Sequence, residues 1–208
     1  MARLTGQQIA DEGLTGWAYL LGGLQTRLRT ETFAAGVALV DAIAAADLNH
    51  HPDVNLRPAH VDIRLTSPDG VTDADVRLAR AISLLAAEAK VPLESASVSR
   101  LELALDTPSR ESVRPFWAAA LALPQADDEI RDPADGLPAI WFQASGSEEP
   151  RQRWHLDVWV DPTQIRPRIA AALAAGGTLV SDEEAPSFWV LADPEGNKVC
   201  LCTWQSRG

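Results

Sequence analysis

The sequence predicts an α+β protein made of two domains, and three observations support that prediction. Short runs with period-two alternation, typical of half-buried strands, are separated by runs with the 3.6-residue spacing of helices. The chain of 208 residues is long enough for two small domains that each bury a core. Periodicity is lost over 90–98, where proline and serine collect, so we place a linker there. The predicted domains are 1–92 and 99–205.

Composition and charge exclude several classes of partner. The net charge of −11 would repel a phosphate backbone, so we expect no nucleic-acid partner. The first residues lack the apolar run of a signal peptide, and no run approaches the length of a membrane span. We therefore expect a cytoplasmic protein with no membrane partner.

Three patterns define the first elements of the chain. Thr5 followed by Gln8 has the spacing of a capping box and predicts a short helix. Two runs that flank Gly22-Gly23 predict a β-hairpin. Thr30 is predicted to cap a second helix, whose apolar stripe is interpreted as core. That stripe consists of Phe33, Val37, Val40 and Ala44.

A further strand and helix follow. Alternation of apolar and polar residues over 61–66 predicts the strand, which ends at the turn Ser67-Pro68-Asp69-Gly70. Thr72, with Asp75 three residues on, has the spacing of a second capping box. Asp75 either serves the helix alone, since the helix dipole favours an acid in the first turn, or has a further role.

The stretch Asn49-His50-His51-Pro52-Asp53 is the leading candidate for a functional site. Histidine is the side chain whose unperturbed pKa, about 6.5, lets it exchange protons near neutral pH. A metal site would need a further ligand, and no cysteine lies in the first half of the chain, so an acid/base site is favoured. The alternative is a solvated helix end, where the helix dipole stabilises a histidine by about 0.3 to 1 kcal/mol.

This Asn-His-His-Pro-Asp run, preceded by a helical segment and followed by a strand and by Thr-x-x-Asp at 72–75, resembles the pterin-4a-carbinolamine dehydratases over roughly residues 4 to 90. The resemblance implies an antiparallel sheet with helices on one face. It also implies dehydration of 4a-hydroxytetrahydropterin to quinonoid dihydropterin, a step of pterin recycling that needs no cofactor. The residues it implies are His50, His51 and Asp75 in catalysis, and Asn49, Pro52 and Asp53 in substrate binding.

The resemblance also implies roles for these residues. One of His50 and His51 would protonate the departing hydroxyl and the other would orient the ring, while Asp75 would hold an imidazole or a ring nitrogen. Two family positions differ in this chain. Ala46 replaces an acidic residue, and Thr66-Ser67-Pro68 replaces a Ser-Thr-His run that carries a third histidine. We therefore expect an activity weakened by the loss of that histidine.

The second half of the chain contains a strand and helix pattern twice, about 55 residues apart, which predicts an internal repeat. The closing run Asp-Pro-Glu-Gly-Asn at 193–197 stands before a final predicted strand. It resembles the glyoxalase-like domains of the vicinal oxygen chelate group, over about residues 99 to 205. That resemblance implies two paired βαβββ modules. It implies no single activity, because the fold hosts many chemistries.

The same resemblance places the metal-ligand positions of such domains at Arg100, His155 and Cys200. An arginine opposes a divalent cation, so we expect no metal. A set of polar and aromatic residues on this face suits a small organic ligand, or else lines a cavity that is filled or covered by a subunit. This second pocket consists of Glu102, Trp141, Gln143, His155, Asp157 and Trp159.

Two hypotheses from different classes result. The leading one is a lyase of the pterin dehydratase type, with a pterin as its small-molecule substrate. The alternative is a non-catalytic or metal-independent small-molecule binding protein that works through the C-terminal pocket. Turnover of a pterin distinguishes the two. The sequence leaves open the ligand of the C-terminal domain and whether the chain is a monomer or a homo-oligomer.

Overall fold

The computed structural model describes residues 2–46, 50–121, 123–124, 129–145, 154–192, 196 and 198–207. Both of its compact units combine helices with a sheet, so the α+β class is confirmed. One unit contains Met1–Ser99 with Val160–Gln164 and Trp204–Gly208, and the other contains Arg100–Trp159 with Ile165–Thr203. The domain limits 1–92 and 99–205 stay predictions.

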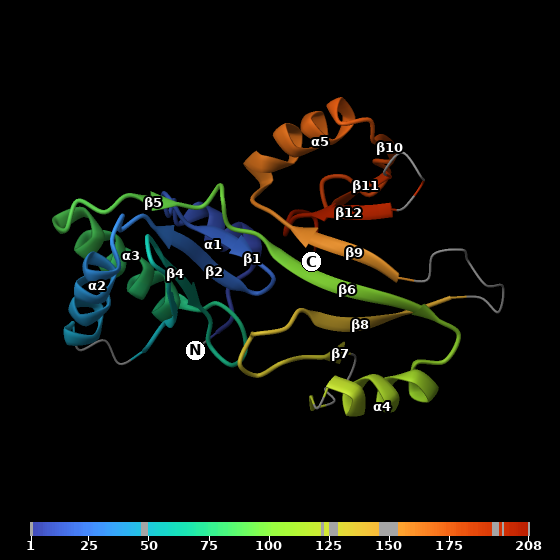
Figure 1. Cartoon of the computed structure of the whole chain (residues 1–208), viewed down its shortest axis with the longest axis horizontal. Helices are drawn as coiled ribbons and strands as arrows, with labels where there is room; N and C mark the ends of the chain where they lie inside the picture. Colours follow the sequence, from blue (N-terminus) through green and yellow to red (C-terminus); the bar gives the residue numbers. More distant parts are fainter. Residues whose placement is uncertain are drawn as a thin grey trace. The chain divides into compact units, whose positions relative to one another are not determined.

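The N-terminal unit contains a five-stranded sheet in the order β1-β2-β4-β3, with β5 also paired to β2 (Figure 1). The described strand pairs of this sheet are all antiparallel. Its elements are α1 (Gly6–Asp11), β1 (Ala18–Leu20), β2 (Gly23–Leu28), α2 (Phe33–Ala45), β3 (Asp53–Leu56), β4 (Val61–Leu65), α3 (Asp73–Glu88) and β5 (Leu93–Glu94).

The core of this unit lies between one face of the sheet and the helices. In the β2–β4 register Leu24 stands opposite Leu65, and both side chains are buried. They belong to one apolar cluster with Ile63 on β4 and Ile82 on α3. Complete burial of side chains of this size contributes roughly 1.5 to 3 kcal/mol each, so this cluster holds α3 against the sheet.

Helix α2 corrects two predictions. Its cap is Thr32, whose hydroxyl accepts a hydrogen bond from the Ala35 amide at 3.2 Å, rather than Thr30. The predicted core stripe is wrong for Phe33, which is 54% exposed, for Val37, which is 46% exposed, and for the exposed Ala44. Its remaining member, Val40, is partly buried against the core.

The face of α2 that is buried contains Gly36, Leu39 and Ile43. A Cβ atom at Gly36 would lie 2.7 Å from Cδ1 of Leu56 on β3, so the helix approaches the sheet closely at a residue without a side chain. This close approach decides which apolar stripe of the helix becomes core.

Two short strands lack an alternating signal in the sequence. Strand β3 begins at Asp53, two residues after His51, and is largely exposed. Strand β5 lies inside the predicted linker and pairs with β2 through Leu93 and Glu94. The segment 90–98, which is predicted to be the linker, therefore contains a short strand at these two residues.

The C-terminal unit contains a seven-stranded sheet in the order β10-β11-β12-β9-β6-β8-β7. Strands β6 and β8 are parallel, β9 and β12 are parallel, and the antiparallel pair β6–β9 joins the two halves. The predicted paired modules are thus present, with a βαβββ order from β9 to β12 and a βαββ order among the described residues from β6 to β8. The elements are β6 (Arg100–Thr107), α4 (Arg110–Leu121), β7 (Glu129–Ile130), β8 (Ala139–Ala144), β9 (Trp154–Trp159), η1 (Pro162–Gln164), α5 (Ile165–Ala174), β10 (Thr178–Ser181), β11 (Phe188–Ala192) and β12 (Lys198–Cys202).

The two faces of this sheet differ in chemistry. Leu105 and Phe142 are buried with Ala118 of α4 on one face. Alternation places Glu102 and Asp157, which are opposite each other in the register, on the other face. The run at 193–197 lies outside the described residues apart from Gly196. None of the helices in the described ranges has the length and apolar composition of a membrane span.

Candidate functional site

The first candidate site joins His50, which lies just before β3, to Asp75 in the first turn of α3. Nε2 of His50 lies 2.7 Å from Oδ1 of Asp75. The Asp75 side chain is 0% exposed, while that of His50 is 27% exposed. A buried carboxylate thus holds the imidazole of a histidine that solvent can still reach.

The second oxygen of Asp75 accepts three hydrogen bonds. Its donors are the Thr72 amide at 2.8 Å, the Thr72 hydroxyl at 2.9 Å and the Ser67 hydroxyl at 2.8 Å. The bond from the Thr72 amide is that of the predicted capping box. Asp75 therefore serves both the helix and the histidine, which the sequence left as alternatives.

These donors decide the charge of Asp75. Burial raises the pKa of the carboxyl group, but hydrogen bonds from the Thr72 amide, His50, Ser67 and the Thr72 hydroxyl lower it, and the net pKa is below the ordinary value. An ionised carboxylate only accepts hydrogen bonds, so Nε2 of His50 carries the proton toward Asp75. The other ring nitrogen, Nδ1, is left for proton exchange.

Ser67 was not predicted as a site residue. It stands at the turn after β4, where its hydroxyl reaches Asp75. Pro68, at the position where the resemblance to the dehydratases implies a third histidine, is exposed at the tip of that turn. A hydroxyl residue five positions before a capping threonine was the available signal, and it is too common to identify a site.

The other predicted residues of the first site are less closely connected to Asp75. His51 is exposed and Pro52 is half-buried. Asp53 is 72% exposed and lies 3.6 Å from the Arg64 guanidinium across the β3–β4 pair. Asn49 lies outside the described residues. The substrate-binding roles of Asn49, Pro52 and Asp53 stay predictions.

The second candidate site lies on the polar face of the C-terminal sheet and centres on His155. Its Nδ1 lies 3.2 Å from Oδ1 of Asp157, and its Nε2 lies 3.1 Å from Oε1 of Gln143 and 3.5 Å from Oδ1 of Asp106. Trp141 meets the imidazole edge-on, with ring centroids 5.9 Å apart, and donates to Asp157 at 3.2 Å. Four predicted pocket residues thus form one network, to which Asp106 adds a charge that was not predicted.

Charge and burial shift two pKa values on this face. The hydrogen bond with Asp157 raises the pKa of His155 against the opposing effect of burial, and the charges of Asp157 and Asp106 raise it further. Burial raises the pKa of Glu102, although a hydrogen bond from the Trp159 indole, 3.2 Å away, acts in the opposite direction. The face therefore shifts His155 toward its cationic form and Glu102 toward its neutral form.

A group with metal-ligand chemistry also lies on this face. His155, Asp157 and Cys200 each offer a ligand atom, and these atoms lie within 4.8 Å of one another. However, both nitrogens of His155 already face oxygen atoms, and a histidine must be neutral to bind a metal. Arg100, at the expected first ligand position, is paired with Asp135.

We predict that the purified protein retains less than about 0.1 equivalent of Zn, Fe, Mn or Ni after dialysis, since Asp157 and Asp106 raise the pKa of His155 and a metal would have to displace a proton from its imidazole. Elemental analysis measures this directly. One retained equivalent that disappears in His155→Ala but persists in His60→Ala, a histidine outside the group, would show a metal site instead.

Comparisons with known proteins match two separate parts of the chain to two different families. Residues 2–85 match the model of the family described as pterin 4 alpha carbinolamine dehydratase, and residues 102–202 match the model of a glyoxalase-like domain. A candidate pterin-4-alpha-carbinolamine dehydratase of Mycobacterium tuberculosis is 34% identical over 91 residues, which are 41% of this chain and 97% of that protein. One from Prochlorococcus marinus is 36% identical over 88 residues, covering 39% of this chain and 92% of that protein.

Solved structures show similarity to each part. A transcriptional coactivator/pterin dehydratase from Brucella melitensis covers 41% of this chain and 99% of its own, with 25% identity and a TM-score of 0.39. A glyoxalase/bleomycin resistance protein/dioxygenase superfamily member from Vibrio splendidus covers 51% of this chain and 99% of its own, with 12% identity and a TM-score of 0.37.

Proposed function

Because the chain belongs to the pterin-4a-carbinolamine dehydratase family through residues 2–85, we propose that its N-terminal domain dehydrates a 4a-hydroxytetrahydropterin to the quinonoid dihydropterin. The observation that carries this proposal is the contact between His50 and the buried carboxylate of Asp75. The contact supplies an oriented imidazole, which is the group such a reaction needs.

The reaction is an elimination of water. The C4a–O bond breaks, the leaving oxygen takes up a proton, and a ring nitrogen loses a proton as the new double bond forms. Electrons are neither gained nor lost, so the step needs no redox partner. A histidine that can both donate and accept a proton near neutral pH meets these demands.

His50 is assigned the proton transfer and Asp75 the positioning of His50. Because Asp75 accepts from Nε2, the substrate would meet Nδ1 of the imidazole. His51 is exposed beside it and is assigned the second role, orientation of the pterin ring or transfer of the other proton. The chain lacks the third family histidine, so we expect turnover below that of dehydratases that carry it.

Stopped-flow absorbance tests the proposal, because the 4a-hydroxy compound and the quinonoid product absorb differently. The compound is generated in the mixing chamber, and its decay is followed with and without protein. Acceleration that saturates with substrate concentration is expected. Decay at the uncatalysed rate would contradict the proposal.

The Ser67→Ala variant is expected to lower kcat about three- to ten-fold with little change in KM, because one of the hydrogen bonds that orient Asp75 is lost. Its matched control is Thr66→Val, since the Thr66 hydroxyl bonds to the Gly22 and Ser67 carbonyl groups and not to Asp75. Equal loss of kcat in both variants would assign the effect to the turn rather than to Asp75.

A second candidate function is binding of a small organic molecule on the polar face of the C-terminal domain. It is favoured by the network in which His155, Asp157, Gln143 and Trp141 share one face. This role is compatible with the dehydratase proposal, and it becomes the leading one if no pterin turnover is measured.

A further inference from the structure

We propose that the C-terminal domain contains a separate binding site for a small, neutral, largely aromatic molecule, on the helix side of its sheet. A pocket of about 510 Å³ lies there, between α4 and strands β6, β8 and β9. Its volume is within the range of small-molecule sites, roughly 300 to 1,000 Å³. It is lined by Leu103, Trp117, Leu137, Pro138, Ile140 and Trp154.

Register shows that this pocket is distinct from the polar face. Leu103 pairs with Ile140 on β8, whereas the neighbouring Glu102 pairs with Ala139 on β8 and with Asp157 on β9. Adjacent residues of a strand point to opposite faces, so the sheet itself separates the pocket from the network around His155.

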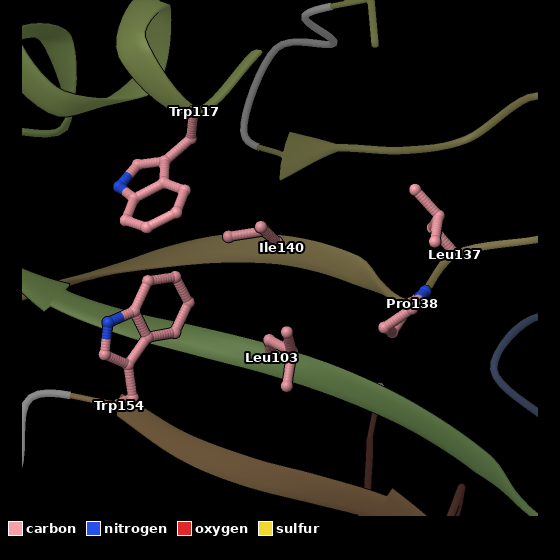
Figure 2. Close-up of a pocket in the computed structure, with 6 residues that line it drawn as sticks. All are labelled: Leu103, Trp117, Leu137, Pro138, Ile140 and Trp154. Atoms are coloured by element: carbon pink, nitrogen blue, oxygen red, sulfur yellow. The ribbon is translucent and has the colours of Figure 1, made fainter. Parts of the chain in front are cut away.

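The shape of the pocket favours a flat ring system. The indoles of Trp117 and Trp154 lie edge to face with their centroids 5.1 Å apart. Figure 2 shows these two rings at one end of the pocket, Leu137 and Pro138 at the other, and Leu103 and Ile140 between them. Indole rings prefer offset or edge-to-face contact with a further aromatic ring, and this arrangement offers such contacts.

The lining also defines the charge of the ligand. All six lining residues are apolar or aromatic, and none carries a charge. Water in such a space would find too few hydrogen-bonding partners, and a charged ligand would lose its hydration without compensation. A neutral apolar molecule displaces poorly bound water and has little hydration of its own to lose, so the pocket favours its binding.

Two fluorescent probes with the same ring system test the charge selectivity. N-phenyl-1-naphthylamine is neutral, and 1-anilinonaphthalene-8-sulfonate adds one sulfonate. The neutral probe is expected to bind the full-length protein saturably with one equivalent, at least about ten-fold more tightly than the charged one. Absence of saturable binding, or equal affinity for the two probes, would overturn the proposal.

Substitution locates the site. Leu103→Trp fills the pocket and is expected to weaken binding of the neutral probe by at least about ten-fold, whereas Leu101→Trp should change it by less than about twofold. Leu101 is on the same strand and face but is 40% exposed and does not line the pocket. Equal effects of the two variants would place the probe elsewhere.

A measurement on the unsubstituted protein gives an independent answer if Leu103→Trp does not fold. The indole N–H resonances of Trp117 and Trp154, assigned with tryptophan to phenylalanine variants, should shift on addition of N-phenyl-1-naphthylamine. The resonance of Trp159, which faces the polar side with Glu102, should stay in place. Shifts confined to Trp159 would contradict the proposed site.

Discussion

Replacement of His50 by glutamine is expected to lower kcat/KM for pterin dehydration by about 10² to 10⁴-fold. Glutamine has a similar reach, and its amide can still donate to Asp75, so the fold and the hydrogen bond should survive. It cannot transfer a proton at neutral pH, and that capacity is what the variant removes. Stopped-flow kinetics with a thermal melt of each variant separates loss of catalysis from loss of fold.

The matched control is His60→Gln in the same domain. His60 is similarly half-buried, and its imidazole lies 3.6 Å from Asp62 rather than near Asp75. Its substitution is expected to change kcat/KM by less than about twofold. Retention of more than half of the activity by His50→Gln, or an equal loss in His60→Gln, would remove His50 from the proposed mechanism.

The Asp75→Ala variant is expected to lose about 2 to 4 kcal/mol of unfolding free energy at neutral pH, because the substitution leaves the buried Thr72 amide without its acceptor and removes the carboxylate that Ser67 and His50 contact. The rate of pterin dehydration should also fall in this variant, since His50 loses its positioning partner. Asp73→Ala is the control, because it removes the same charge from the same helical turn at an exposed position. Asp73→Ala is expected to lower the unfolding free energy by about 0.3 to 1 kcal/mol.

The difference in unfolding free energy between the wild type and Asp75→Ala depends on pH in a definite direction. The folded pKa of Asp75 lies below its unfolded value, about 3.9, so its contribution is complete above that value and is lost as the pH falls toward the folded pKa. Urea unfolding of the wild type and Asp75→Ala should show a constant difference from about pH 7 to 5 that shrinks below about pH 4. A difference that grows in acid would mean that Asp75 is neutral in the folded protein.

The sequence anticipated the parts of the site that depend on local spacing. Thr72 and Asp75 are three residues apart, and the capping box that this spacing predicts is present. The His50 contact joins residues 25 positions apart, and the resemblance of the whole motif left open whether Asp75 holds an imidazole or a ring nitrogen of the substrate. Ser67 was missed because its role depends on how the turn after β4 returns to α3, which spacing along the chain does not encode.

Helix α2 shows why a periodic pattern can be assigned to the wrong face. An alanine-rich helix offers more than one apolar stripe, and the prediction selected one that has helical spacing and leads to the histidine pair. Packing selected the stripe that contains Gly36, because the missing side chain lets the helix approach β3. Closeness of approach is a tertiary property that spacing along the chain does not encode, and it leaves Phe33 and Val37 exposed.

The apolar pocket of the C-terminal domain had no sequence signal either. Its residues come from α4, from three strands and from the segment before β8, and each of them alone fits a position in an ordinary core. The polar residues of the opposite face could be grouped in advance because the resemblance to glyoxalase-like domains places them on one face. Alternation predicts which residues share a face, but it does not predict where packing leaves space.

The most direct test of the dehydratase proposal is the first-order rate constant for decay of 4a-hydroxytetrahydropterin at pH 7.5 in three samples. These are buffer alone, wild-type protein and the double variant His50→Gln/His51→Gln, with folding of the variant verified by circular dichroism. We expect the wild type to accelerate decay and the folded double variant to match buffer. Decay at the buffer rate with wild type, or equal acceleration by the double variant, would contradict the proposed function.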